Sequence, residues 1–281
     1  MNIRSADFVL EIGSGHNPKA RSDVLCDKFI DDDHQRGGGI VSDRSIVEAD
    51  GQYLPFADSS FDYVICSHVL EHIENPKLMI SELERVASRG YIEVPSEISE
   101  RLYGWPYHLW IFNLIDDKLL IQEKINLDQF GQLFHTLVTE DKGFLRFHKK
   151  YHPIFLIQYE WNQKIDYEFR DPTTPALDFN SSEIITRMLR DVQTTPWLKT
   201  WQPFIKDLVP KKVISSLKTM IAKKRRQPSK NLRDIVVCPD CKLEVKWEDK
   251  FIYCNHCDAD YPILGDIPRL TPKPKKDQPN A

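Results

Sequence analysis

Short apolar runs alternate with polar, helix-length or loop segments over the first third of the chain. The runs lie at residues 8–12, 23–29, 46–50, 61–67 and 90–95, and they include the stretches FVLEI, YVIC and YIEV. Strands of a parallel sheet have this composition, because helices cover both of their faces. We therefore expect five strands of one buried parallel sheet.

One amphipathic helix is expected between the fourth and fifth of these runs. Asn75 can cap its first turn, and Pro76 takes the first helical position, where no amide donor is needed. The stripe that would face the sheet consists of Met79, Ile80, Leu83, Val86 and Ala87. Strands and helices in this alternation predict an α/β fold with an open, doubly wound, Rossmann-like sheet. Ligands of such sheets bind beyond the carboxyl ends of the strands.

The later part of the chain changes character several times. Residues 1–195 are expected to form the α/β domain, in which aromatic-rich segments after residue 100 indicate a helical excursion followed by added strands. Residues 196–233 form a basic, amphipathic linker, and residues 234–270 form a small module that carries four of the six cysteines. The polar segment 271–281 is expected to be a disordered tail.

Length and composition fit an ordinary globular protein of about two domains, since the 281 residues are 41% hydrophobic and 28% charged. The net charge of -4 gives no global basic field that would favour nucleic acid. No run of 18 apolar residues is present, and the first residues enter a strand pattern without a signal peptide. We therefore expect a cytoplasmic location.

A glycine loop follows the first apolar run. Gly13 and Gly15 allow backbone amides to approach a ligand closely, which suggests a nucleotide-like ligand. The third glycine of the dinucleotide-binding fingerprint is replaced by Pro18, which disfavours NAD. Asp27 ends the second expected strand, where a carboxylate can accept both hydroxyls of a ribose. Asp50 ends the third, where it can accept an exocyclic amine of adenine.

These residues, in this order, resemble a known family. The pattern is Glu11-x-Gly13-x-Gly15, Asp27, Asp50-Gly51-x-x-Leu54-Pro55-Phe56, Ser60-Phe61-Asp62 and Ser67-His68-Val69-Leu70-Glu71-His72. It is similar to the class I S-adenosylmethionine-dependent methyltransferases, over roughly residues 7–97. Two features depart from the family pattern, namely the short stretch between Gly15 and Asp27 and the pair Asn17-Pro18 in place of a third glycine.

The resemblance implies a cofactor site for S-adenosylmethionine. Its methionine moiety would lie on Glu11, Gly13, Ser14 and Gly15, and its ribose on Asp27. The resemblance places adenine against Asp50 and Gly51, and the methyl group beside Ser67 and His68.

Methyl transfer is an in-line displacement, and a hydroxyl acceptor must also lose a proton, so a general base would help. The candidates are His68, Glu97 and His108, which come after the fourth and fifth expected strands. The motif Asn-Pro-Pro-Tyr of the adenine and glutamine N-methyltransferases is absent, because Ser67-His68-Val69 stands in its place. We therefore favour O-methylation of a sugar, a glycan or another small metabolite. RNA or a translation protein is the alternative acceptor, and a non-catalytic scaffold is the second alternative.

Two Cys-x-x-Cys knuckles, separated by twelve residues, mark the C-terminal module. The four thiols belong to Cys238, Cys241, Cys254 and Cys257, a set that suits one tetrahedral zinc ion with no open position. A module of this size lacks a large core, so a structural zinc ion would supply much of its stability. A rubredoxin-like iron centre or a redox pair is the alternative. The knuckles are followed by Asp260-Tyr261-Pro262-Ile263 and Gly265-Asp266-Ile267-Pro268. This segment resembles the small zinc-ribbon activator protein that partners tRNA, ribosomal RNA and release-factor methyltransferases. The resemblance makes RNA or a protein an alternative substrate.

The linker combines tryptophans with basic residues. From Lys206 to Arg233 it holds ten Lys or Arg and one acid, and apolar residues recur near helical spacing over 197–226. Such a segment can dock on the α/β domain, lie peripherally on an anionic membrane or contact RNA. The first interpretation is favoured.

Overall fold

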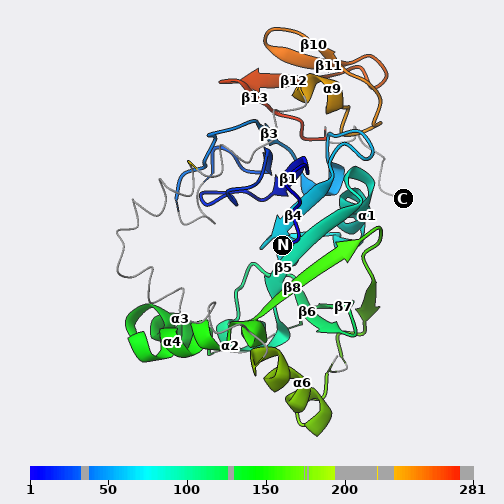
Figure 1. Cartoon of the computed structure of the whole chain (residues 1–281). Coiled ribbons are helices and arrows are strands. Elements are labelled where there is room, and N and C mark those ends of the chain that lie inside the picture. Colours follow the sequence, from blue (N-terminus) through cyan, green and yellow to red (C-terminus); the bar gives the residue numbers. More distant parts are fainter. Residues whose placement is uncertain are drawn as a thin grey trace, which may run out of the picture.

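A computed structural model of the chain describes residues 1–32, 38–125, 130–173, 175, 177–193, 220 and 231–272 (Figure 1). Nearly all of the linker 196–233 therefore lies outside the described residues, as does most of the segment 271–281.

A six-stranded, mostly parallel sheet forms the centre of the molecule, in the order β3-β2-β1-β4-β5-β8. Five parallel strands come from the N-terminal third: β1 (Val9–Ile12), β2 (Val24–Asp27), β3 (Ile46–Glu48), β4 (Tyr63–Ser67) and β5 (Arg89–Pro95). Each lies within or close to one of the five apolar runs, so the expected α/β sheet is confirmed. The sixth strand, β8 (Leu156–Asn162), runs antiparallel beside β5.

The expected helix is α1 (Pro76–Val86), which connects β4 to β5. The side chain of Asn75 accepts a hydrogen bond from the Leu78 amide at 3.1 Å and so caps the first turn. The apolar stripe packs on the sheet, where Met79, Ile80, Leu83 and Val86 are buried. Two short 3-10 helices border the carboxyl edge of the sheet, η1 (Gly51–Tyr53) and η2 (Leu70–His72).

The segment after β5 forms a second layer below the main sheet (Figure 1). Helix α2 (Glu97–Tyr103) leads into β6 (Trp110–Ile115) and β7 (Lys118–Glu123), which form a three-stranded sheet with β9 (Tyr167–Arg170). Four helices belong to the same layer: α3 (Gly131–Glu140), α4 (Lys142–Lys150), α5 (His152–Phe155) and α6 (Ser182–Gln193). Helix α2 comes first, and β8 and β9 follow the helices α3–α5, in line with the expected helical excursion and added strands. Strands β6 and β7, between α2 and α3, were not expected there.

The C-terminal module consists of α9 (Leu232–Ile235) and an antiparallel sheet of four strands. These are β10 (Lys246–Trp247), β11 (Phe251–Cys254), β12 (Ala259–Leu264) and β13 (Ile267–Pro268). The module packs on the main sheet beside β3 and α1 (Figure 1). The hydrophobic core is continuous across this boundary, since Phe56 belongs to the same buried cluster as Val236 and Tyr261.

Polar contacts also join the module to the main domain. The Val237 amide donates to the Pro55 carbonyl at 3.0 Å, and the Lys242 ammonium lies 2.8 Å from the Glu82 carboxylate. Arg269 pairs with Asp31 and with Glu48.

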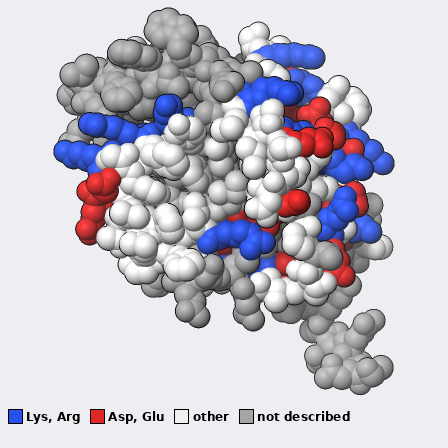
Figure 2. All heavy atoms as spheres, turned by 90° about the horizontal axis from the view of Figure 1, so that it is seen from below, with Lys and Arg blue, Asp and Glu red and all other residues white. Residues whose placement is uncertain are grey.

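Figure 2 views the molecule from below relative to Figure 1. Among the residues that the structure describes, Lys, Arg, Asp and Glu side chains of both signs are interspersed around a broad uncharged area on this face. Within the described part of the chain, no helix has the length and apolar character needed to cross a membrane.

Candidate functional site

A cavity of about 580 Å³ lies beyond the carboxyl ends of the parallel strands. This is the size range of small-molecule sites. It is lined by most of the residues that the sequence suggested for a cofactor: Glu11, Gly13, Ser14, Gly15, Asp27, Gly51 and Ser67. His68 also lines it, whereas Asp50, Glu97 and His108 are not among the lining residues.

The glycine loop is a left-handed turn directly after β1. Gly13 has a φ of +67° and Gly15 a φ of +51°, a region that side chains disfavour. A Cβ atom on Gly13 would lie 2.1 Å from a methyl carbon of Val69, so the loop also needs glycine for lack of space. The Gly13 amide donates to the carbonyl of Cys26 at 2.8 Å, which holds the turn against β2.

Asp27 joins this loop to the end of β2. One carboxylate oxygen accepts from the Gly15 amide at 2.9 Å, and the other accepts from the Phe29 amide at 3.1 Å. The side chain is buried, yet it lines the cavity. Asp27 therefore shapes the loop while it faces the space in which a ligand would lie.

Asp50 lies beside the cavity rather than on its wall. It caps η1 by accepting from the Gln52 amide at 2.9 Å, and it pairs with the Lys28 ammonium at 2.7 Å. Burial alone would raise the pKa of Asp50, but the hydrogen bonds from Lys28 and Gln52 outweigh it and lower the pKa. Its neighbours Gly51 and Gln52 line the cavity, whereas Asp50 does not.

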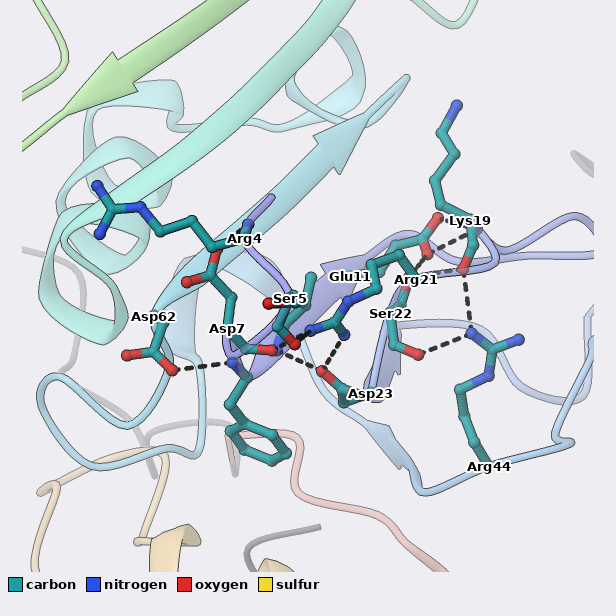
Figure 3. Close-up of polar contacts among 12 residues, drawn as sticks. Arg4, Ser5, Asp7, Glu11, Lys19, Arg21, Ser22, Asp23, Arg44 and Asp62 are labelled. Carbon is teal, nitrogen blue, oxygen red and sulfur yellow. Dashed lines mark hydrogen bonds and ion pairs between the residues drawn. The ribbon is translucent and has the colours of Figure 1, made fainter. Parts of the chain in front are cut away.

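Glu11 closes the far end of the glycine loop (Figure 3). Its two carboxylate oxygens accept from the Lys19 amide at 3.0 and 2.8 Å, and one of them also accepts from the Ser22 hydroxyl. Arg44 also stabilises the segment 19–22, because it donates hydrogen bonds to the carbonyls of Lys19 and Ser22. Burial raises the pKa of Glu11 despite these contacts. The carboxylate therefore holds residues 13–19 in place at the cavity wall.

His68 stands at the end of β4 in a left-handed conformation, with a φ of +56°. Its ring is half-exposed, with Nδ1 3.3 Å from Glu71 and Nε2 3.8 Å from Glu93. Burial lowers the pKa of His68, but the hydrogen bond that its ring donates to Glu71 and the charges of the Glu71 and Glu93 carboxylates outweigh it and raise the pKa. The site thus favours the charged imidazolium.

Glu93 supports the cavity wall from behind Ser67, a role that could not be inferred when the sequence alone was considered. It lies near the carboxyl end of β5, buried, and accepts from the hydroxyls of Ser67 and Tyr91 and from the Gln158 amide. Burial alone would raise the pKa of Glu93, but these hydrogen bonds and the Lys19 charge lower it to about 2. The signal available in the sequence was an acid inside the otherwise apolar run YIEV.

The other two candidate bases lie away from the cavity. Glu97 is fully buried at the start of α2, where it accepts from Arg101 and from the Asn113 amide. His108 is also buried, with its Nδ1 atom 2.6 Å from a carboxylate oxygen of Glu100. Of the three candidate bases, the structure therefore brings only His68 to the cavity wall.

The four cysteines of the C-terminal module converge. Their sulfur atoms all lie within 4.8 Å of one another. The distance is 3.9 Å between the sulfur atoms of Cys238 and Cys257, and 3.6 Å between those of Cys241 and Cys254. A tetrahedron with Zn–S bonds of about 2.3 Å has edges of roughly 3.8 Å, so this set fits one zinc ion.

Comparison with known proteins gives a family match over part of the parallel sheet. A methyltransferase-domain model matches residues 25–92. A demethylmenaquinone methyltransferase of Thermobifida fusca is 31% identical over 78 residues, which are 25% of this chain and 33% of that protein. An uncharacterized protein of Methanocaldococcus jannaschii is 49% identical over 45 residues, which are 16% of this chain and 22% of that protein.

The chain thus spans about a fifth to a third of the length of the curated relatives it matches. A solved complex of the Haloferax volcanii Trm112 methyltransferase activator with a putative methyltransferase aligns over 38% of this chain and 53% of that one. The identity is 20% and the TM-score 0.30. Residues 25–92 thus match a methyltransferase domain, and the parallel sheet that carries them has a Rossmann-like α/β fold.

Proposed function

We propose that this protein transfers the methyl group of S-adenosylmethionine to an oxygen of a sugar, a glycan or another small metabolite. The observation that carries the proposal is the cavity beyond the parallel strands. Most of the residues that the family motif assigns to the cofactor line it, among them Glu11, Asp27 and Ser67, whereas Asp50 lies beside it.

Bound S-adenosylmethionine would supply an electrophilic methyl group on a sulfonium. The left-handed turn at Gly13 and Gly15 leaves room for the methionine end, and Asp27 can accept the hydroxyls of the ribose. His68 would border the methyl group and, as an imidazolium, donate a hydrogen bond to an acceptor oxygen. A base must be neutral to take a proton, so His68 would serve as a base only above its raised pKa.

We further propose that Cys238, Cys241, Cys254 and Cys257 hold one structural zinc ion. Four thiolates leave no open coordination position, so the ion would stabilise the module rather than take part in methyl transfer. The spacing of the sulfur atoms supports zinc.

Calorimetric titration with S-adenosylmethionine tests the cofactor site. We expect the wild-type protein to bind one molecule per chain and Asp27→Ala to weaken binding by roughly tenfold to a hundredfold, because charged hydrogen bonds to the ribose are lost. The matched control is Asp249→Ala, in the exposed turn before β11, which should bind normally. No binding by a folded, zinc-loaded wild-type protein would favour the scaffold alternative.

Transfer of a labelled methyl group distinguishes the acceptors. Label in small sugars or lipid-linked glycans supports the proposal, whereas label in RNA or in a translation protein contradicts it. RNA binding that weakens steeply as salt rises would favour the RNA alternative further.

The roles of the linker 196–233 and the domain limits stay predictions. Loss of liposome co-sedimentation on deletion of residues 197–226 would support the membrane interpretation.

A further inference from the structure

Two segments bring together three side chains of metal-ligand type, of which His72 lines the cavity and the other two are buried behind it. Glu71 and His72 belong to η2, and His108 precedes β6. A carboxylate oxygen of Glu71 and one ring nitrogen of each histidine all lie within 4.8 Å of one another. The Leu109 amide donates to the Glu71 carbonyl at 2.8 Å, and this backbone contact fixes the two segments side by side.

Two of these three side chains carry buried polar atoms without a partner among the described residues. Glu71 is 1% exposed, and while its Oε1 atom contacts His68, its Oε2 atom has no hydrogen bond. The Nδ1 atom of His72 is likewise buried and unpaired, although the ring also hydrogen-bonds to the backbone of Tyr107. Buried polar groups in folded proteins are rarely left without a partner, so a bound ion or water is expected beside them.

The third side chain, His108, has a carboxylate behind its ring, as many metal-binding histidines do. The Nδ1 atom of His108 is 2.6 Å from Glu100, which is 1% exposed and whose other oxygen accepts from Lys124. Because a carboxylate only accepts hydrogen bonds, Nδ1 donates to Glu100, which leaves Nε2 as the ring nitrogen that can bind a metal ion. A carboxylate behind a histidine orients the ring and raises its basicity in many metal sites.

We propose that Glu71, His72 and His108 bind a divalent first-row metal ion, with Mn²⁺ and Zn²⁺ as the best-fitting ions. Two imidazoles and one carboxylate suit these ions and leave coordination positions open. His72 lines the cavity, together with Tyr107, so an ion here would face the space next to His68. An acceptor oxygen could then occupy an open position. That role rests on the proposed methyl transfer, whereas the binding of the ion does not.

Titration with Mn²⁺, followed by electron paramagnetic resonance, tests the site. Mn²⁺ prefers nitrogen and oxygen ligands, so the four cysteines do not compete for it. We expect one Mn²⁺ per full-length chain and at least a roughly tenfold loss of affinity in His72→Gln and in His108→Gln. The control is His135→Gln, an imidazole on α3 that contacts Tyr103 and Trp105 but lies outside the cluster.

Unchanged Mn²⁺ binding in the two cluster variants would overturn the proposal. So would a wild-type protein that binds no Mn²⁺ and no Zn²⁺ beyond that held by the cysteines. If His108→Gln does not fold, as judged by circular dichroism, His72→Gln decides the test, because its ring lies at the cavity wall. Titration of the same samples with S-adenosylmethionine separates the two proposals: cofactor binding without metal binding overturns the metal site alone.

Discussion

Gly13 and Gly265 are both left-handed, but only Gly13 is crowded. A Cβ atom on Gly13 would meet Val69 at 2.1 Å, whereas one on Gly265 would have no atom within 4 Å. We expect Gly265→Ala to cost about 1 kcal/mol through backbone strain alone. Gly13→Ala should cost about 1–3 kcal/mol more through overpacking. Urea unfolding of the two variants measures the difference, and equal losses would show that Val69 gives way freely.

Glu93 should make the stability of the protein depend on acid pH. Its carboxyl has a folded-state pKa of about 2 against an ordinary 4.5, so its contribution is complete above about pH 4.5 and is lost as the pH falls toward 2. At neutral pH that contribution is at most about 3 kcal/mol. The measurement is urea unfolding of the wild type and Glu93→Gln at several pH values. A stability gap that stays constant between pH 5 and 2 would contradict the expectation.

For single residues, the sequence could predict a position in the site where the hydrogen-bond partners are close along the chain. Gly13 directly follows β1, and Asp27 is the last residue of β2. Hydrogen bonds between the glycine loop and the end of β2 hold both in place. Glu93 accepts a hydrogen bond from Gln158, which lies 65 residues later in the chain, on β8. No local sequence pattern predicted that β8 pairs with β5. His108 meets Glu100 and η2 only through the packing of the second layer, so neither its burial nor its neighbours could be foreseen.

Among the elements, α1 is joined to the loop before β4 by backbone hydrogen bonds and by the side chain of Arg85. Arg85 donates to the carbonyls of Leu54 and Phe56 at 2.9 and 2.6 Å, and it pairs with Glu82 and Asp58. A lysine keeps the charge but lacks the planar fork. We expect Arg85→Lys to lower the free energy of unfolding by about 2 kcal/mol.

The control for this change is Arg170→Lys. The pair of Arg170 with Glu168 is exposed, and such pairs contribute roughly 0–1 kcal/mol. Chemical unfolding of both variants gives the comparison. Similar losses would mean that the carbonyl contacts of Arg85 contribute little.

The elements of the N-terminal third were predictable because each apolar run is a whole buried strand, and because the cap at Asn75 marks where α1 begins. The second layer was not, since β7 pairs with β9 across more than 40 residues that include three helices. Aromatic residues there pack between elements, for example Trp110 against Phe169, and give no clear period of their own.

For the whole molecule, the shared core predicts that the cysteine module and the sheet unfold together. Ile235 and Tyr261 of the module belong to one buried cluster with Phe56 of the main domain. We expect Cys254→Ser to lose the proposed zinc ion and to lower the melting temperature of a single transition by roughly 5 °C or more, since 1 kcal/mol is worth about 2–4 °C at this size.

The control for the zinc prediction is His256→Ala, an exposed position in the same knuckle that is not one of the four ligands. It should keep both the zinc content and the melting temperature. Scanning calorimetry with metal analysis provides both readouts. Two separate transitions, or an unchanged melting temperature without zinc, would contradict coupled unfolding.

The position of the module has a consequence for aggregation. β3 is the outermost strand of the six-stranded sheet, and an outermost strand exposes unpaired backbone groups that can recruit a strand from another molecule. Here the Leu270 amide donates to the Glu48 carbonyl at 2.7 Å, and Arg269 forms a parallel bridge with Glu48. The segment after β13 therefore shields the border of the sheet. A fragment that ends before residue 231 would leave this border open to self-association, however well its own core is packed.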